Sequence, residues 1–152
     1  MNRAKEMKKV CLLVLLLMLL AGCAVKEATA AQEENTPEPA KTRYEILVLV
    51  ESRELFLFCD EELFRVYPVA IGKTSTPTPK GDFTVVNKIE CPYRKAYGTR
   101  WIGLSAPGIG IHGTNDPSSI GTHASNGCIR MLNEDIEELF KFVEIGTRVF
   151  IL

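Results

Sequence analysis

The amino-acid sequence predicts one mainly β domain with a single short helix near its C-terminus. Short runs rich in Val, Ile, Leu and Phe recur between polar turns from residue 44 onward, which is the pattern of β-strands. Only residues 133–143 carry apolar positions at helical spacing. The chain of 152 residues, 46% hydrophobic and 24% charged, has the composition of one globular domain with a small appendage.

The first half of the domain is predicted to be an antiparallel meander of three strands. Residues 44–50 and 55–58 flank a polar turn at 51–54, which indicates a hairpin. A third strand is expected at 64–71, after the polar turn at 60–62. Three adjacent antiparallel strands are the simplest arrangement of these segments.

The second half is predicted to hold further short strands, the helix and a closing strand. After a Thr/Pro-rich loop, strands are expected at 82–89, 101–104, 109–112 and 147–152. Asn133 is expected to cap the helix, and Gly146 to end the helical segment. The core-facing positions of the helix are expected to be Ile136, Leu139, Phe140 and Val143.

Residues 1–22 are predicted to be a lipoprotein signal peptide. A basic start at residues 1–9 precedes an uninterrupted apolar run at 10–20, which is shorter than the roughly 20 apolar residues of a membrane-spanning helix. The run ends in Leu20-Ala21-Gly22-Cys23, which resembles the lipobox of bacterial lipoproteins. By this resemblance Cys23 is expected to be the lipidated first residue of the mature protein, with a plain cleaved signal as the alternative.

Residues 23–43 are predicted to be the lipidated Cys23 followed by a disordered tether, and residues 44–152 to be the folded domain. After Val25 the tether has no bulky apolar residue, so it cannot bury enough surface to offset its chain entropy. The protein is therefore expected to be exported and held at a membrane through its lipid anchor.

Charge argues against nucleic acid as a partner. The chain has 18 Lys+Arg and 19 Asp+Glu, and removal of its basic signal peptide leaves a mildly acidic protein. Such a protein lacks the basic surplus that neutralises phosphates. No metal is expected, because there is no Cys-x-x-Cys and the two histidines, His112 and His123, are not at ligand spacing. No cofactor is expected either.

Cys128 is the candidate nucleophile. It lies in the segment Ser125-Asn126-Gly127-Cys128-Ile129-Arg130-Met131, whose small residues permit access to the sulfur and to backbone amides that could hold an oxyanion. A buried, inert thiol is the alternative. Cys59 and Cys91 also lie in the predicted domain, and the sequence leaves open whether they form a disulfide.

His112 is the candidate base. It ends the predicted strand 109–112, with its side chain on the face opposite its apolar neighbours. The turn-forming residues 114–117 follow it, so that chain reversal could bring Cys128 back beside the imidazole. His123, five residues before Cys128, is the rival base.

Together these segments resemble the signature of the L,D-transpeptidase (YkuD) domain. The resemblance rests on Ile111-His112-Gly113-Thr114-Asn115 and on residues 125–131, with support from Thr76-Pro77 through Phe83 and from residues 97–101. It covers residues 44–152 and implies a compact β-sandwich or barrel-like catalytic domain. Members of the family usually carry His where this chain has Asn126.

The resemblance implies an enzyme that acts on peptidoglycan stem peptides, without a cofactor, in the cell wall or periplasm. Cys128 would attack the carbonyl of the third stem residue and form a thioester with release of D-Ala, and an amine would then take the acyl group. His112 would be the general base, and the backbone carbonyl of Gly113 would orient its imidazole. The oxyanion and substrate-binding set would comprise Ser125, Asn126, Gly127 and Arg130.

The sequence leaves two alternative functions open. An L,D-carboxypeptidase would resolve the same thioester with water, and a non-catalytic peptidoglycan-binding lipoprotein would use the same groove without chemistry. Arg130 could face a substrate carboxylate or pair with an acidic neighbour. Tyr97 and Trp101 could line the groove or pack in the core.

Overall fold

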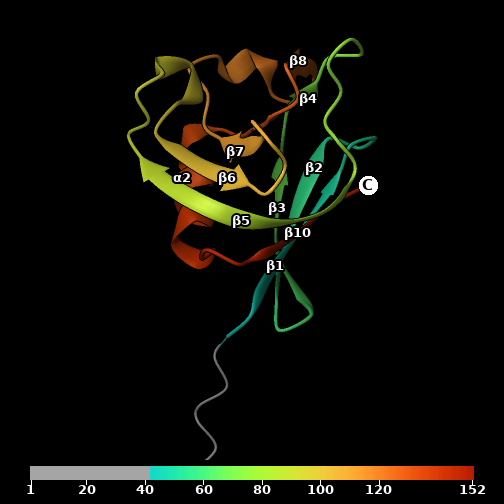
Figure 1. Cartoon of the computed structure of the whole chain (residues 1–152), viewed down its shortest axis with the longest axis vertical. Coiled ribbons are helices and arrows are strands. Elements are labelled where there is room, and N and C mark those ends of the chain that lie inside the picture. The colour runs from blue at the N-terminus through green and yellow to red at the C-terminus, as the bar shows by residue number, and fades with distance from the viewer. Residues whose placement is uncertain (1–41) are drawn as a thin grey trace, which may run out of the picture. The chain divides into compact units, whose positions relative to one another are not determined.

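The computed structural model describes residues 42–152 (Figure 1). The signal peptide predicted for residues 1–22, the lipid site Cys23 and most of the predicted tether lie outside the described residues. Along the chain the elements are β1 (Tyr44–Leu49), β2 (Glu54–Cys59), β3 (Glu62–Pro68), β4 (Ile71–Gly72), β5 (Gly81–Glu90), the 3₁₀-helix η1 (Lys95–Tyr97), β6 (Arg100–Leu104), β7 (Gly110–His112), the 3₁₀-helix η2 (Pro117–Ser119), β8 (His123–Ser125), β9 (Ile129–Arg130), α2 (Asn133–Phe142) and β10 (Arg148–Ile151).

Eight strands form one curled sheet, and the fold is mainly β as the sequence predicts. Their order is β3-β2-β1-β10-β5-β6-β7-β9, with β4 and β8 in a separate parallel pair. The first three strands form the expected antiparallel meander. The closing strand β10 lies between β1 and β5, parallel to the first and antiparallel to the second. The C-terminal strand therefore joins the first meander to the strands that follow it.

The single strand predicted at 64–71 is divided in the structure. β3 ends at Pro68, which has no N–H to continue a ladder. Ala70 then forms an isolated bridge with Arg130, and β4 pairs with β8 instead of the main sheet. The division carries the chain from the meander to the part of the fold that contains the predicted site.

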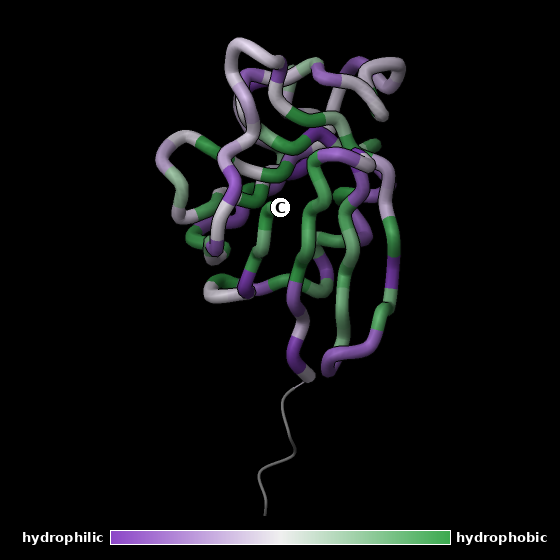
Figure 2. The backbone as a smooth tube through the Cα atoms, turned by 90° about the vertical axis from the view of Figure 1, so that its right-hand side faces the viewer, coloured by the Kyte–Doolittle hydropathy of each residue, from purple (hydrophilic) through white to green (hydrophobic). Residues whose placement is uncertain are grey.

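The core lies between the sheet and helix α2. Residues of β1 and β2 alternate between buried and partly exposed positions, and Figure 2 shows apolar strands that end in polar turns. On α2, Ile136 and Leu139 are buried, as is Val143 just beyond its end, whereas Phe140 is partly exposed. Each fully buried side chain of this size contributes about 1.5–3 kcal/mol. Within residues 42–152, no helix has the length and apolar character to cross a membrane.

Asn133 does not cap the helix as predicted. The N-cap position is Leu132, which makes no capping hydrogen bond, and Asn133 is the first helical residue. Its Oδ1 accepts instead from the backbone N–H of Thr99, at 3.2 Å. Gly113 leaves room for this contact, since a Cβ at that position would lie 2.3 Å from the same oxygen. The Asn133 amide therefore joins α2 to the turn before β6.

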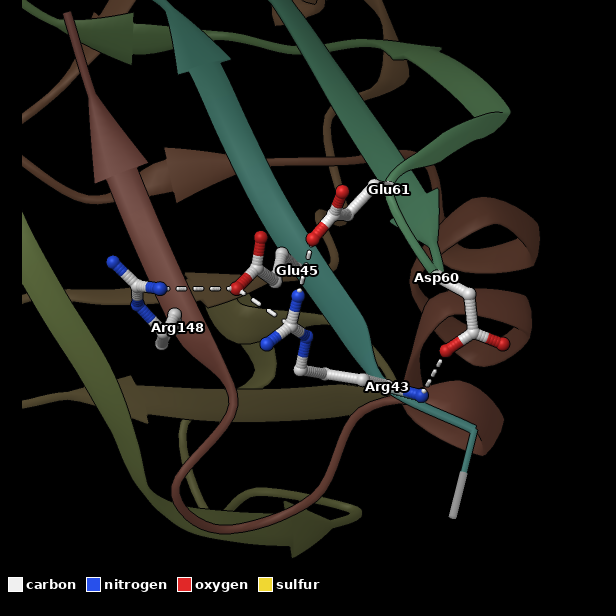
Figure 3. Close-up of polar contacts among 5 residues, drawn as sticks. All are labelled: Arg43, Glu45, Asp60, Glu61 and Arg148. Atoms are coloured by element: carbon white, nitrogen blue, oxygen red, sulfur yellow. Dashed lines mark hydrogen bonds and ion pairs between the residues drawn. The ribbon is translucent and has the colours of Figure 1, made fainter. Parts of the chain in front are cut away.

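Charged contacts surround the start of β1 (Figure 3). The backbone N–H of Arg43 donates to Asp60, and its guanidinium donates to Glu61, both at 2.9 Å. Glu45 lies 3.8 Å from Arg43 and accepts from Arg148 at 3.2 Å. Exposed pairs of this kind contribute little stability individually. They connect β1 to the β2–β3 turn and to β10.

Replacing Lys88 with methionine is expected to destabilise the domain by about 1–3 kcal/mol. The Lys88 Nζ donates to the backbone oxygens of Phe140 and Val143, both at 2.7 Å, and lies 4.1 Å from the centroid of the Phe140 ring. Methionine keeps the apolar stem but leaves these carbonyls at the end of α2 without their donor. Urea unfolding of the variant measures the loss, and the exposed Lys80→Met is the matched control. Equal midpoints for the two variants would contradict the anchoring role.

Candidate active site

The parallel pairing of β7 with β9 brings the predicted base and nucleophile to one face of the sheet. Ile111 lies opposite Ile129, and His112 lies opposite Arg130. Because side chains alternate along a strand, Cys128 and Arg130 leave the backbone on the side opposite the buried Ile129. This is the side on which His112 lies. The structure therefore gathers the two predicted partners on neighbouring segments.

His112 is buried, with 3% of its surface exposed, and is held by Gly113. Its Nδ1 lies 2.5 Å from the backbone oxygen of Gly113. A carbonyl oxygen only accepts, so this contact assigns the ring proton to Nδ1 and leaves a lone pair on Nε2. Burial lowers the pKa of His112 to about 4, an effect that the Gly113 carbonyl opposes and the charge of Arg130 reinforces. The imidazole is therefore neutral at neutral pH and able to accept a proton.

The Cys128 thiol is partly buried at the turn before β9. Its Sγ lies 3.6 Å from the backbone oxygen of Gly108. Burial raises the pKa of Cys128, while a backbone hydrogen bond from Gly110 and the charge of Arg130 act in the opposite direction. The resting thiol is therefore protonated at neutral pH. A nucleophile in this state requires a base to remove its proton during attack.

Ser125 fixes the turn that presents Cys128. Its side chain is buried, and its Oγ donates to the Cys128 backbone oxygen at 2.5 Å and accepts from the Gly127 N–H at 3.1 Å. Gly127 has a φ of 112°, which side-chain-bearing residues rarely adopt. The amide of Gly127 is therefore engaged within the turn, which sequence reasoning did not anticipate. Asn126 is exposed beside it.

Arg130 brings positive charge to both reacting groups. Its backbone pairs with Ala70, and its charge lowers the pKa of both His112 and Cys128. Its Nε is buried and has no hydrogen-bond partner within residues 42–152. A buried donor of this kind is costly unless it finds an acceptor.

The rival base His123 lies elsewhere. It is exposed at the start of β8, and its Nδ1 lies 3.2 Å from the backbone oxygen of Gly72. It therefore belongs to the β4–β8 pair and not to the face that carries His112. Cys59, Cys91 and Cys128 are all free thiols.

A hollow of about 690 Å³ between the start of β1 and the end of α2 contains none of the predicted site residues. Between Thr42 and Leu152, no three His, Cys, Asp or Glu side chains gather as metal ligands would.

The burial of His112 predicts a stability that falls in acid. An unfolded His titrates near 6.5 and the folded His112 near 4, so the unfolded state binds more protons between these values. The free energy of unfolding therefore decreases as pH falls through this window, by about 3 kcal/mol in total. Urea unfolding between pH 7 and pH 4 measures the change. His112→Gln should remove this component, and an unchanged pH dependence in that variant would contradict the assignment.

Known proteins share both the sequence and the fold. The family model for the L,D-transpeptidase catalytic domain, YkuD, matches residues 43–151. YkuD of Bacillus licheniformis is 46% identical over 113 residues, an alignment covering 74% of this chain and 68% of that protein. YkuD of Bacillus subtilis is 43% identical over 115 residues, covering 76% and 70%.

Solved structures share the fold of the described domain. L,D-transpeptidase 3 of Mycobacterium tuberculosis superposes with a TM-score of 0.66 at 18% identity, and the match covers 73% of this chain and 61% of that one. The catalytic domain of the Enterococcus faecium L,D-transpeptidase gives a TM-score of 0.64 at 29% identity, covering 72% of this chain and 96% of that one.

Proposed function

Because the chain belongs to the YkuD family of L,D-transpeptidase catalytic domains, we propose that it cross-links peptidoglycan stem peptides through a thioester on Cys128. The donor is a tetrapeptide stem that loses its terminal D-Ala, and the acceptor is an amine. The observation that supports this proposal best is that the neutral His112 is paired with Arg130 of β9, the strand that begins directly after Cys128.

In the proposed first step, the Cys128 sulfur attacks the carbonyl carbon that joins the third stem residue to D-Ala. The His112 Nε2 takes the thiol proton as the carbon–sulfur bond forms, and then delivers it to the departing nitrogen of D-Ala as the carbon–nitrogen bond breaks. In the second step the acceptor amine attacks the thioester. His112 removes a proton from that amine and returns it to the leaving sulfur. No net oxidation or cofactor is involved.

The surrounding residues have proposed roles in the same steps. The Gly113 carbonyl holds the ring proton on Nδ1, so that Nε2 faces the chemistry. Since the Gly127 amide already donates to Ser125, we assign the oxyanion to the backbone N–H of Cys128. Arg130 is proposed to bind a carboxylate of the stem peptide, and Asn126 to lie at the exposed mouth of the site.

Acylation by imipenem is the experiment that tests the proposed nucleophile. One of the solved structures with the same fold is an LD transpeptidase in complex with imipenem, which motivates this probe. The full chain in detergent is expected to gain one imipenem mass by intact-protein mass spectrometry, and Cys128→Ser to gain none. Cys91→Ser is the matched control, since Cys91 is an exposed free thiol. A folded wild type that gains no adduct would favour the non-catalytic peptidoglycan-binding alternative.

The proposal includes a location outside the cytoplasmic membrane. Peptidoglycan stem peptides are extracytoplasmic, and residues 10–23 carry the apolar run and lipobox-like ending of an exported lipoprotein. We propose that a lipid on Cys23 and the tether after it hold the domain facing the cell wall or periplasm. Mass spectrometry of the N-terminal peptide should find a diacylglycerol on Cys23, and Cys23→Ala should release the protein from membranes. An unmodified Cys23 would indicate a plain cleaved signal.

A further inference from the structure

Two rows of residues cross the sheet on the face that carries His112, one over β5, β6, β7 and β9 and the other over β5, β6 and β7. In each row, one residue per strand is the partner of the residue on the next strand. The first row is Ile89, Trp101, His112 and Arg130. The second row is Asn87, Gly103 and Gly110, and it ends on β7. Cys128 is close to this end of the row, because a backbone hydrogen bond from Gly110 acts to lower its pKa.

The two glycines of the second row leave space that larger side chains fill. A Cβ on Gly110 would lie 2.6 Å from Cζ2 of the Trp101 indole. A Cβ on Gly103 would lie 2.5 Å from Oδ1 of Asn87. Contacts this short do not occur, so any side chain at either position would displace the indole or the amide. The glycines thus permit the indole of Trp101 to lie over Gly110 and the amide of Asn87 to lie over Gly103.

Asn87 holds the indole by a hydrogen bond. The Trp101 Nε1–H donates to Oδ1 of Asn87 at 3.1 Å. The pairing of β5 with β6 shifts register between Val85 and Asn87, an irregularity that redirects the side chains after it. Asn87 is on β5 and Trp101 is on the paired strand β6, so this hydrogen bond favours one orientation of the indole.

The indole in turn lies against the imidazole of His112. The two rings are nearly parallel, at 14°, with centroids 5.6 Å apart, which is an offset stack. Tyr97 contacts both rings, with centroids 4.7 Å from that of His112 and 4.8 Å from that of Trp101. The ring of His112 is therefore held by aromatic neighbours as well as by the carbonyl of Gly113.

We propose that Trp101 and Asn87 are positioning residues that act through His112. Asn87 fixes the indole, and the indole fixes the plane of the imidazole and excludes water from one of its faces. Nε2 of His112 thereby stays directed at the thiol of Cys128. The proposal concerns the same site and rests on the proposed role of His112 as the base. It also assigns Trp101 to the support of that base and not to substrate binding.

The first test reads the imidazole directly and needs no reaction. The chain contains only two histidines, so ¹⁵N-histidine NMR of the full chain in detergent gives two rings, which His123→Gln distinguishes. In wild type, His112 should be protonated on Nδ1 with a pKa of about 4. In Trp101→Leu the pKa should rise toward 6.5 and both tautomers should appear, because water reaches the ring. The Tyr97 ring that contacts His112, the Gly113 carbonyl and the charge of Arg130 are unchanged in this variant.

Trp101→Phe and Tyr93→Leu complete this test. In Trp101→Phe an aromatic ring remains against His112, so the pKa of His112 should stay near the wild-type value. This conservative variant keeps the test informative if Trp101→Leu fails to fold. Tyr93 is fully exposed, and its loss removes an aromatic residue outside the stack. A folded Trp101→Leu whose His112 signals match those of wild type and of Tyr93→Leu would overturn the proposal.

The second test measures the rate of acylation by imipenem. Trp101→Leu should slow acylation roughly tenfold, since small displacements of a reacting group have large effects on rate. Asn87→Leu should slow acylation less than Trp101→Leu does. Adding Asn87→Leu to Trp101→Phe should not slow acylation further, because phenylalanine has no indole N–H to donate to Asn87. If the effects of Asn87→Leu and Trp101→Phe on the rate are additive, the proposed action of Asn87 through the indole is wrong. If Trp101→Leu is slower but its His112 spectrum matches wild type, Trp101 binds substrate instead of positioning the imidazole. Absence of acylation in wild type would overturn the proposed function, and the NMR test would still decide the positioning role.

Discussion

Replacing His112 with alanine is expected to slow acylation of Cys128 by roughly a thousandfold, the scale of a lost general base. The thiol is protonated at rest because burial raises its pKa, so the sulfur depends on a base for each attack. His112 is neutral because burial lowers its pKa, and its Nδ1 is engaged by Gly113. The rate constant for imipenem adduct formation, followed by mass spectrometry, measures the effect.

His123→Ala is the matched control for this prediction. His123 is the only other histidine of the chain, and it is exposed in the β4–β8 pair. Its loss should leave the rate within about twofold of wild type. His112→Gln should be as slow as His112→Ala, although it fills more of the buried space. A wild-type rate in His112→Ala, or an equal loss in His123→Ala, would remove His112 from the mechanism.

Replacing Gly72 with alanine is expected to destabilise the domain by about 3 kcal/mol or more. A Cβ at Gly72 would lie 2.3 Å from the backbone oxygen of Thr76 and 2.6 Å from the backbone nitrogen of Thr78. Both neighbours are main-chain atoms, so the loop at 73–80 would have to move as a unit. That loop contacts the turn before Cys128, because the Lys73 N–H donates to the Ser125 oxygen at 3.0 Å. Urea unfolding measures the loss, and a slower acylation should accompany it.

Gly121→Ala separates this steric effect from backbone strain. Gly121 has a φ of 81°, and a Cβ there would meet nothing within 4 Å. Its replacement should therefore destabilise by only about 1 kcal/mol, the effect of placing an ordinary residue in the left-handed region. Equal losses for Gly72→Ala and Gly121→Ala would contradict the packing of the 73–80 loop against β4.

Local periodicity explains why much of the fold was predictable. Apolar alternation located the strands of the meander, and the helical spacing of Ile136 and Leu139 located α2 and its buried face. Strand order depends on contacts far apart in sequence, which periodicity does not encode. The insertion of β10 beside β1 could therefore not be predicted. Pro68, by contrast, is a local signal that the strand expected at 64–71 is divided.

In the candidate site too, features marked by local sequence could be predicted, and features that depend on long-range contacts could not. Cys128 and His112 could be proposed because residue type, small neighbours and a recognisable motif mark them. Two hydrogen bonds could not be predicted, because they depend on side-chain geometry that sequence spacing does not give. They join the Gly127 N–H to the Ser125 Oγ and the Thr99 N–H to the Asn133 Oδ1. Asn87 belongs to no motif, and its connection to the site depends on its pairing with Gly103 and its hydrogen bond to Trp101, both of which are long-range contacts.

Incubation with a stem tetrapeptide tests the central proposal most directly. The full chain in detergent would receive the tetrapeptide and a free D-amino acid as amine acceptor, in water enriched in ¹⁸O, with Cys128→Ser as the matched control. Mass spectrometry should find a tripeptidyl thioester on Cys128, one D-Ala released for each product, and a product that contains the new amine without ¹⁸O. A tripeptide product labelled with ¹⁸O would show that water is the acceptor and that the protein is an L,D-carboxypeptidase. Product formation by Cys128→Ser, or an intact tetrapeptide with folded wild type, would contradict thioester catalysis at Cys128.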